Sequence, residues 1–215
     1  MYMKHMTILL TVSVLAAATL FSACAAPHTA TTAGVKIDKD NLSEIYYAGG
    51  CFWGVEDFFS KIPGVYDVVS GYANGNTQNP TYEEVCAHNT GFAETVRVSY
   101  DANVISLEVL TAQFFKLVSP TAKNMPNDQY RSGIYYTESA QKDVIDAVLR
   151  EVQERCESPV TTEVLPLLNF YEAEDYHQDY VEKSAGGACH VNNAALEDLK
   201  ITEDGKVVDI TRGID

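Results

Sequence analysis

The stretch YYAGGCFWGVEDFF, residues 46–59, predicts the junction around which the fold is built. Before it, Ile45–Ala48 is a short apolar run typical of a strand. After two glycines, apolar residues recur at helical spacing up to the helix-ending pair Pro63-Gly64. These residues are Phe52, Val55, Phe59 and Ile62. The pattern therefore places Cys51, beside the single tryptophan Trp53, where a strand passes into a helix.

Strand and helix patterns alternate along the rest of the chain, without an internal repeat. Alternating or apolar runs predict strands at Val65–Tyr72, Glu94–Tyr100, Ile134–Tyr136, Val160–Leu165 and Phe170–Ala173. Helical spacing predicts helices at Tyr82–His88, Ser106–Val118, Glu138–Arg155 and Tyr176–Lys183. The alternation predicts one α/β domain over residues 44–198, followed by a polar extension, 199–215, with a hairpin around Asp204-Gly205.

The composition is that of an acidic globular protein. Of the 215 residues, 46% are hydrophobic, which is enough for a folded core. Lys and Arg together number 15 and Asp and Glu 30, so the formal net charge is −15. A chain this acidic lacks the basic surface by which proteins bind nucleic acid or an anionic membrane surface.

The N-terminal segment has the pattern of an export signal. Lys4 precedes an apolar run, Ile8–Phe21, which is short for a membrane span and ends in small residues. The end of this segment resembles the lipobox of bacterial lipoproteins, in which Cys24 is lipidated, although Phe21 stands where that motif prefers leucine. We expect a lipoprotein signal over residues 1–24, a tether over 25–43, and a membrane-anchored protein of the bacterial cell envelope. The alternative is an ordinary signal peptide.

Four cysteines remain after export: Cys51, Cys86, Cys156 and Cys189. An even number of cysteines in an exported protein can indicate two structural disulfides. A domain of this size, however, does not need disulfides for stability. The sequence contains no C-x-x-C motif, which argues against a zinc knuckle and a thioredoxin-type redox pair.

Cys51 has the setting of a reactive thiol. The unpaired backbone N–H groups of a first helical turn, with the helix dipole, favour an anion and so lower the pKa of a thiol there. Glycines on both sides leave the backbone approachable. The alternative is a small core cysteine, the commoner fate of a lone cysteine.

Several blocks of sequence resemble the type A peptide methionine sulfoxide reductases. GGCFWG matches the signature of that family, and SGYANGNTQNPTYEEVC, GFAETVRVSYD, QYRSGIYYT and FYEAEDYHQDY follow in the family's order, over roughly residues 44–190. The resemblance implies an α+β fold, a two-layer α/β sandwich with a ferredoxin-like core. It also implies reduction of methionine S-sulfoxide, protein-bound or free, without metal, flavin or nicotinamide.

The resemblance implies a role for each residue of the site. Cys51 attacks the sulfoxide sulfur and becomes a sulfenic acid, while Glu94 matches the family's acid and shares a proton with the thiol. The residues that match the family's oxygen-holding hydroxyls and nearby carboxylate are Tyr82, Tyr130 and Asp128. The predicted slot for the substrate methyl group consists of Phe52 and Trp53. Without the resemblance, Glu94 reads equally well as a surface residue, the tyrosines as packing residues and Phe52 as core.

Recycling of the sulfenic acid is assigned by the same resemblance. Cys189, in the glycine-containing loop AGGACH, resembles the resolving cysteine, and a thioredoxin-like protein then reduces the disulfide. Cys86 and Cys156 are predicted to be packing residues, although a Cys51–Cys86 pairing remains open. His177 and His190 have no ligand-spaced partners, which predicts structural or surface roles.

Three positions depart from the family pattern: Phe92 where histidine is common, a shortened loop between Pro120 and Gln129, and Ala188 where an aromatic is frequent. Two rival functions are a general thiol peroxidase or disulfide exchanger, and an exported protein that binds methionine-containing peptides. The first predicts faster turnover of peroxide than of methionine sulfoxide. The second predicts that Cys51→Ala leaves function intact.

Overall fold

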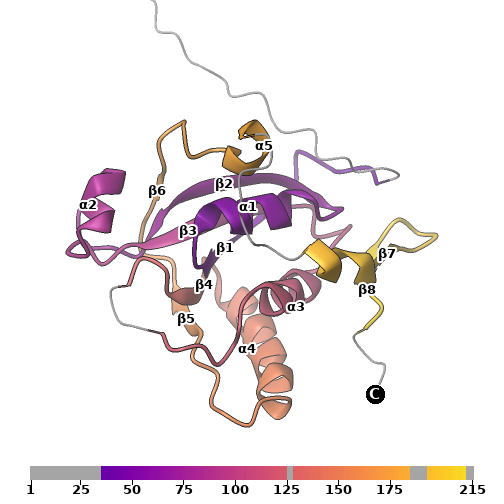
Figure 1. Ribbon diagram of the computed structural model, residues 1–215. Helices are drawn as coiled ribbons and strands as arrows, with labels where there is room; N and C mark the ends of the chain where they lie inside the picture. Colours follow the sequence, from indigo (N-terminus) through magenta and orange to yellow (C-terminus); the bar gives the residue numbers. More distant parts are fainter. Residues whose placement is uncertain (1–34, 125–127, 185–192, 212–215) are drawn as a thin grey trace, which may run out of the picture.

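The computed structural model describes residues 35–124, 128–184 and 193–211, and it has one six-stranded sheet with helices packed on it (Figure 1). The strands of the sheet are β1 (Ser43–Gly49), β2 (Val65–Ala73), β3 (Ala93–Tyr100), β4 (Ser132–Tyr136), β5 (Glu163–Pro166) and β6 (Phe170–Glu172). The α-helices are α1 (Phe52–Ser60), α2 (Tyr82–Cys86), α3 (Leu107–Leu117), α4 (Ser139–Glu154) and α5 (Tyr180–Lys183). In these ranges no helix is long and apolar enough to cross a membrane.

The strand order confirms the predicted ferredoxin-like core. The order is β5-β4-β1-β3-β2-β6, and the four central strands arise from two successive units, β1-α1-β2 and β3-α3-β4. The pairs β4–β1, β1–β3 and β3–β2 are all antiparallel. Each unit therefore leaves room for a strand of the other between its own two strands, and β5 and β6 extend the two edges.

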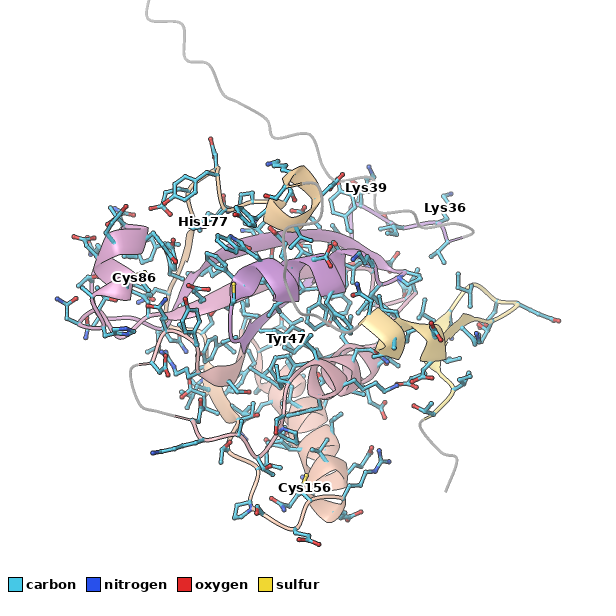
Figure 2. The ribbon with its side chains drawn as sticks, in the orientation of Figure 1. Lys36, Lys39, Tyr47, Cys86, Cys156 and His177 are labelled. Carbon is cyan, nitrogen blue, oxygen red and sulfur yellow. The ribbon has the colours of Figure 1, made fainter. Side chains whose placement is uncertain are left out.

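The core lies between the sheet and its helices. Tyr47 of β1 is fully buried and stacks between Phe59 of α1, at a ring distance of 4.7 Å, and Phe114 of α3, at 5.0 Å (Figure 2). Its hydroxyl forms a 3.1 Å hydrogen bond with Thr111. A fully buried aromatic side chain stabilises the folded state by about 1.5–3 kcal/mol through burial alone. The strand-to-helix junction of the opening stretch is therefore fixed by packing on both helices.

The other face of the sheet carries a smaller apolar cluster, covered by the chain that crosses from β5 to β6. Its buried members are Tyr46, Ala48, Ala73, Ala93 and Tyr135, and Leu167 and Phe170 pack against them. The helices thus form one layer and the sheet the other, with only a short crossing segment behind it, as a two-layer sandwich requires.

The predicted C-terminal hairpin exists and packs onto the domain. It consists of β7 (Leu199–Ile201) and β8 (Val207–Asp209), shown in yellow in Figure 1. Val207 is 3% exposed and belongs to the main core, and its backbone N–H donates to Val104 at 2.7 Å. Next to it, the buried Asp209 carboxylate lies 2.8 Å from the Lys116 ammonium of α3.

One predicted helix is wrong in its extent. Helical geometry covers only Tyr180–Lys183 of the predicted range, because Asp179 has a left-handed backbone conformation, with φ 56°. The Gln178 side chain accepts a hydrogen bond from Ser70 N and donates to Ser70 O and Ala173 O. These bonds hold the preceding turn against β2 and bring His177 toward α1. We call residues 174–180 the aromatic turn, because it carries Tyr176, His177 and Tyr180.

Candidate active site

Cys51 is the N-cap of α1, where the sequence pattern predicted it. It is exposed, with φ −60° and ψ 118°, and its carbonyl accepts a hydrogen bond from Gly54 N at 3.3 Å. Gly50 before it has φ 85°, a conformation that glycine adopts without strain, and a Cβ there would have no neighbour within 4 Å. The turn therefore presents the thiol at an open helix start.

Glu94 of β3 lies behind this helix start. It is 1% exposed, and its Oε2 accepts a hydrogen bond from the backbone N–H of Phe52 at 3.1 Å. Its Oε1 accepts from Gln129 Nε2 at 3.2 Å. The backbone N–H that follows Cys51 thus donates to the Glu94 carboxyl group, which brings Glu94 to the start of α1.

The pKa of Glu94 suits an acid that works near neutral pH. Burial raises it to about 7, against the opposing effect of the hydrogen bonds from Phe52 and Gln129. An ordinary glutamate is ionised at pH 7, whereas the raised pKa of Glu94 lets its protonated form persist near neutral pH. A protonated carboxyl group can therefore lie beside the start of α1.

Tyr82 and Tyr130 share the surroundings of Glu94. Burial raises the pKa of Tyr82, and its hydrogen bond with Cys86 and the charges of Tyr130, Cys86 and Glu94 add to the rise. Burial also raises the pKa of Tyr130, as do the charges of Glu94, Cys51 and Cys86. Both hydroxyls therefore stay protonated and can donate hydrogen bonds. Tyr130 is 48% exposed, so it lies where the site meets the protein surface.

Of the two predicted slot residues, only Trp53 reaches the surface. Phe52 is 1% exposed and packs in the core against Tyr72 and His177. Trp53 is half-buried, and its indole stacks on Tyr180 at a ring distance of 3.7 Å and an angle of 11°. The accessible apolar wall beside Cys51 therefore comes from Trp53.

Of the two roles predicted for His177, structural and surface, the structure shows the structural one. It is 1% exposed, and its Nδ1 accepts a hydrogen bond from Trp53 Nε1 at 3.1 Å. Burial lowers its pKa, so the ring is neutral at pH 7 and can accept at Nδ1. The rings around it are those of Phe52, Trp53, Tyr82 and Tyr176. The sequence signal was its place in the quoted block FYEAEDYHQDY.

Glu174, at the start of the aromatic turn, connects that turn to α2. Its Oε1 accepts from the backbone N–H of Tyr82, and its Oε2 accepts from the Tyr72 hydroxyl, each at 2.9 Å. Burial opposes ionisation of this carboxyl group, but the hydrogen bonds outweigh it and lower the pKa. The turn thus holds Tyr82 through Glu174 and Trp53 through His177.

Gln129 and Cys86 also belong to the site. Gln129 is 3% exposed; its backbone carbonyl accepts from Glu94 N at 2.8 Å, and its Nε2 lies 3.7 Å from the Cys86 sulfur. Cys86 was predicted to be an inert packing residue, but it is half-buried within this polar network because the short helix α2 ends beside Gln129. Cys156 follows α4 and lies far from Cys86 and His177 (Figure 2).

Asp128 contacts the site through the backbone N–H of Tyr130. Its Oδ1 accepts from Tyr130 N at 2.9 Å, and its carbonyl accepts from Arg131 Nη1 at 3.1 Å. Arg131 in turn forms a 2.8 Å ion pair with Glu163. Asp128 therefore stabilises the turn on which Tyr130 lies at the protein surface.

Phe92, where the resembling family commonly has histidine, is a core residue. It is 1% exposed and meets Tyr171 edge-on at a ring distance of 5.8 Å. Gly75 lies directly against it, and a Cβ at that glycine would come within 2.2 Å of the phenyl ring.

Cys24, Cys189 and His190, all named from the sequence, lie outside the described residues. Across the described ranges, no group of three or more His, Cys, Asp or Glu side chains is arranged to hold a metal ion. What the structure brings together is Cys51, Glu94, Tyr82, Tyr130 and Trp53.

The chain matches known proteins over most of its length. The family model described as peptide methionine sulfoxide reductase matches residues 43–206. A peptide methionine sulfoxide reductase MsrA of Lachnoclostridium phytofermentans is 46% identical over 160 residues, which cover 73% of this chain and 96% of that protein. The protein of the same name from Clostridium perfringens is 49% identical over 154 residues, covering 70% and 98%.

Solved structures agree with these relatives. Reduced Mxr1 from Saccharomyces cerevisiae has a TM-score of 0.65 and 35% identity, covering 72% of this chain and 92% of that one. Methionine sulfoxide reductase A of Corynebacterium diphtheriae has a TM-score of 0.61 and 32% identity, covering 69% and 78%. Mxr1 has also been solved in complex with Trx2, with a TM-score of 0.50. The chain belongs to the peptide methionine sulfoxide reductase family.

Proposed function

We propose that this protein reduces methionine S-sulfoxide in proteins to methionine by thiol chemistry, with the free amino acid as a further candidate substrate. The observation that carries the proposal is the buried carboxyl of Glu94, with a pKa raised to about 7, bonded to the backbone N–H that follows Cys51. A sulfoxide oxygen leaves only when protonated, so a soft nucleophile next to a proton source fits this substrate. Family membership supports the S epimer.

In the first step, the Cys51 thiolate attacks the sulfoxide sulfur, and Glu94 supplies the proton to the oxygen. The oxygen passes to Cys51 as a sulfenic acid and methionine leaves as the sulfide, so the substrate sulfur is reduced by two electrons and Cys51 is oxidised by two. Tyr82 and Tyr130, both protonated, hold the oxygen by hydrogen bonds. Trp53 provides the apolar surface for the methyl group.

In the second step, Cys189 attacks the Cys51 sulfenic acid, forms a disulfide and releases water. A thioredoxin-like dithiol then reduces this disulfide and restores both thiols. The support for the reductant is the complex of the related Mxr1 with Trx2. The place of Cys86 in the polar network keeps a Cys51–Cys86 bond as the alternative outcome of the same step.

The proposal includes export. The N-terminal pattern of a basic residue, an apolar run and a lipobox-like end supports a lipid-anchored protein of the bacterial cell envelope, attached through Cys24. Globomycin treatment tests this: a lipoprotein accumulates as its uncleaved precursor, whereas an ordinary signal peptide is still removed.

The decisive test is a single turnover of the reduced protein with each sulfoxide epimer, followed by mass mapping of the disulfide. We expect one methionine per protein from the S epimer, none from the R epimer, and a Cys51–Cys189 bond. Unchanged S epimer, or a bond lacking Cys51, contradicts the reductase mechanism. A Cys51–Cys86 bond contradicts only the assignment of Cys189.

Two controls separate the rival functions. A general thiol peroxidase turns over hydrogen peroxide faster than methionine sulfoxide, and the reductase does the reverse. A peptide-binding protein keeps its function in Cys51→Ala, whereas the reductase loses all turnover in that variant and retains the fold.

A further inference from the structure

A buried carboxyl group that the proposed chemistry does not use lies one helical turn beyond Trp53. Glu56 of α1 is 3% exposed. Its Oε2 accepts a hydrogen bond from the backbone N–H of Asp179 at 2.9 Å, and its Oε1 has no hydrogen-bond partner among the described residues. Burial raises the pKa of this group to about 8, and the charge of Asp179 adds to the rise. Burial destabilises the ionised form of a carboxyl group, so we expect a structural role for Glu56 in the contacts that it makes.

The partner of Glu56 is the strained residue of the aromatic turn. Asp179 has a left-handed backbone, with φ 56° and ψ 31°, which residues other than glycine adopt only when their surroundings hold them there. Its carboxylate is 3.2 Å from Lys183 Nζ in α5, and its backbone N–H donates to the Glu56 carboxyl group in α1. The hydrogen bond from the Asp179 backbone N–H to Glu56 therefore ties the point at which the turn reverses to α1.

That turn places both contacts of the Trp53 indole. His177, two residues before Asp179, accepts from Trp53 Nε1 at 3.1 Å, and Tyr180, the residue after it, stacks on the indole at 3.7 Å. Trp53 and Glu56 are three residues apart and lie on neighbouring parts of one helix surface. α1 therefore contacts the aromatic turn at two points, the Trp53 indole and the Glu56 carboxyl group. Figure 2 shows His177 beside the segment that leads to α5.

We propose that Glu56 is a positioning residue for the substrate pocket: its hydrogen bond to Asp179 N holds His177 and Tyr180 against Trp53 and so sets the apolar wall. The part concerning substrate rests on the proposed function, and the part concerning Trp53 does not. Loss of this bond lets the indole rotate away from its two contacts, so the pocket loses its preset shape.

The test compares Glu56→Gln with Glu56→Met. Glutamine keeps an acceptor of the same reach, whereas methionine fills a similar volume without one. The readout is tryptophan emission, because Trp53 is the single tryptophan of the chain and its signal reports this wall alone. We expect Glu56→Gln to keep the wild-type emission and KM, and Glu56→Met to shift the emission to longer wavelength and raise KM about five- to tenfold, with kcat changed less than twofold.

Gln113→Met is the matched control. Gln113 is also fully buried and donates one hydrogen bond, to Asp209 at 2.8 Å, on the side of the domain that carries the C-terminal hairpin. We expect this variant to lower the melting temperature without changing emission or KM. A general effect of lost stability predicts the same change in both methionine variants and contradicts the proposal.

Wild-type emission in folded Glu56→Met also overturns the proposal, whatever the activity. If Glu56→Met does not fold, Glu56→Asp tests the same contact, because it keeps the carboxyl group but withdraws it by one methylene; we expect a smaller emission shift in the same direction, and an unchanged spectrum overturns the inference. If wild type reduces neither epimer, the proposed function fails while the emission comparison still decides the role of Glu56.

Discussion

Glu94 and Asp209 are two buried carboxyl groups with opposite surroundings. Glu94 receives only hydrogen bonds from a backbone amide and a side-chain amide, and burial raises its pKa to about 7. Burial acts against ionisation of Asp209 as well, but the hydrogen bonds from Lys116 and Thr211 and the Lys116 charge prevail and lower its pKa. Burial without a cation gives a proton donor, whereas burial with a cation gives a fixed charge that joins the hairpin to α3.

The largest expected effect is on the chemistry at Glu94. Glu94→Gln keeps the size of the side chain but removes the transferable proton, so we expect the single-turnover rate to fall about 10³-fold. Rapid-quench measurement with the S epimer checks this. A rate within tenfold of wild type would show that the proton comes from another group. Glu94 would then not be the proton donor that its contrast with Asp209 implies.

The second effect is a difference in pH dependence. Folding raises the pKa of Glu94 from 4.5 to about 7, so the stability contributed by its protonated form is complete below pH 4.5 and is lost as the pH rises through 7. This loss is about 3 kcal/mol. Relative to wild type, the free energy of unfolding of Glu94→Gln should therefore rise by that amount between pH 4 and pH 8, measured by urea titration. A constant difference would refute the raised pKa.

Asp209 shows the reverse sign. Folding lowers its pKa, so its contribution is present above its unfolded pKa and is lost as the pH falls through the folded value. Asp209→Asn leaves Lys116 with Asp198 as an ion-pair partner at 2.9 Å, so we expect only the loss of a charged hydrogen bond, about 2 kcal/mol at pH 7, and unchanged turnover. If Asp209→Asn lowered turnover as much as Glu94→Gln does, the C-terminal hairpin would contribute to the chemistry at the site.

The smallest effect belongs to an ion pair on the hairpin surface. Lys206 and Asp204 are 3.7 Å apart, with side chains 63% and 64% exposed. We expect Lys206→Ala to leave the free energy of unfolding, measured by urea titration, unchanged within experimental error, because water screens such pairs. A change as large as that of Asp209→Asn would show that burial is not what makes the Lys116–Asp209 pair stronger than the Lys206–Asp204 pair.

Local patterns were sufficient for the core and for the position of Cys51 at the start of α1. The spacing of Phe52, Val55 and Phe59 predicted α1, and all three are buried. The alternation around Glu94 predicted β3 and places Glu94 on the same face as Val96 and Val98, whereas its role as an acid followed only from the resemblance. The alternation did not show that the opposite face, which carries Thr95, is buried as well.

The missed residues depend on contacts between distant parts of the chain. The bonds from Trp53 to His177 and from Asp179 to Glu56 join residues more than a hundred positions apart. The Tyr176–Lys183 helix was wrong for the same reason, because Gln178 and Glu56 hold a left-handed turn that helical spacing does not reveal. Neither the neutral histidine nor the buried carboxyl group has a local sequence signature.

Phe92 and Gly75 act as one steric unit, with consequences for anyone exchanging segments between this protein and its relatives. The phenyl ring occupies the space that a Cβ at position 75 would need, at 2.2 Å. A chimera that imports a larger residue at position 75 while keeping Phe92 must displace the loop after β2 or the start of β3. The start of β3 carries Glu94. Grafts should therefore transfer residues 75 and 92 together.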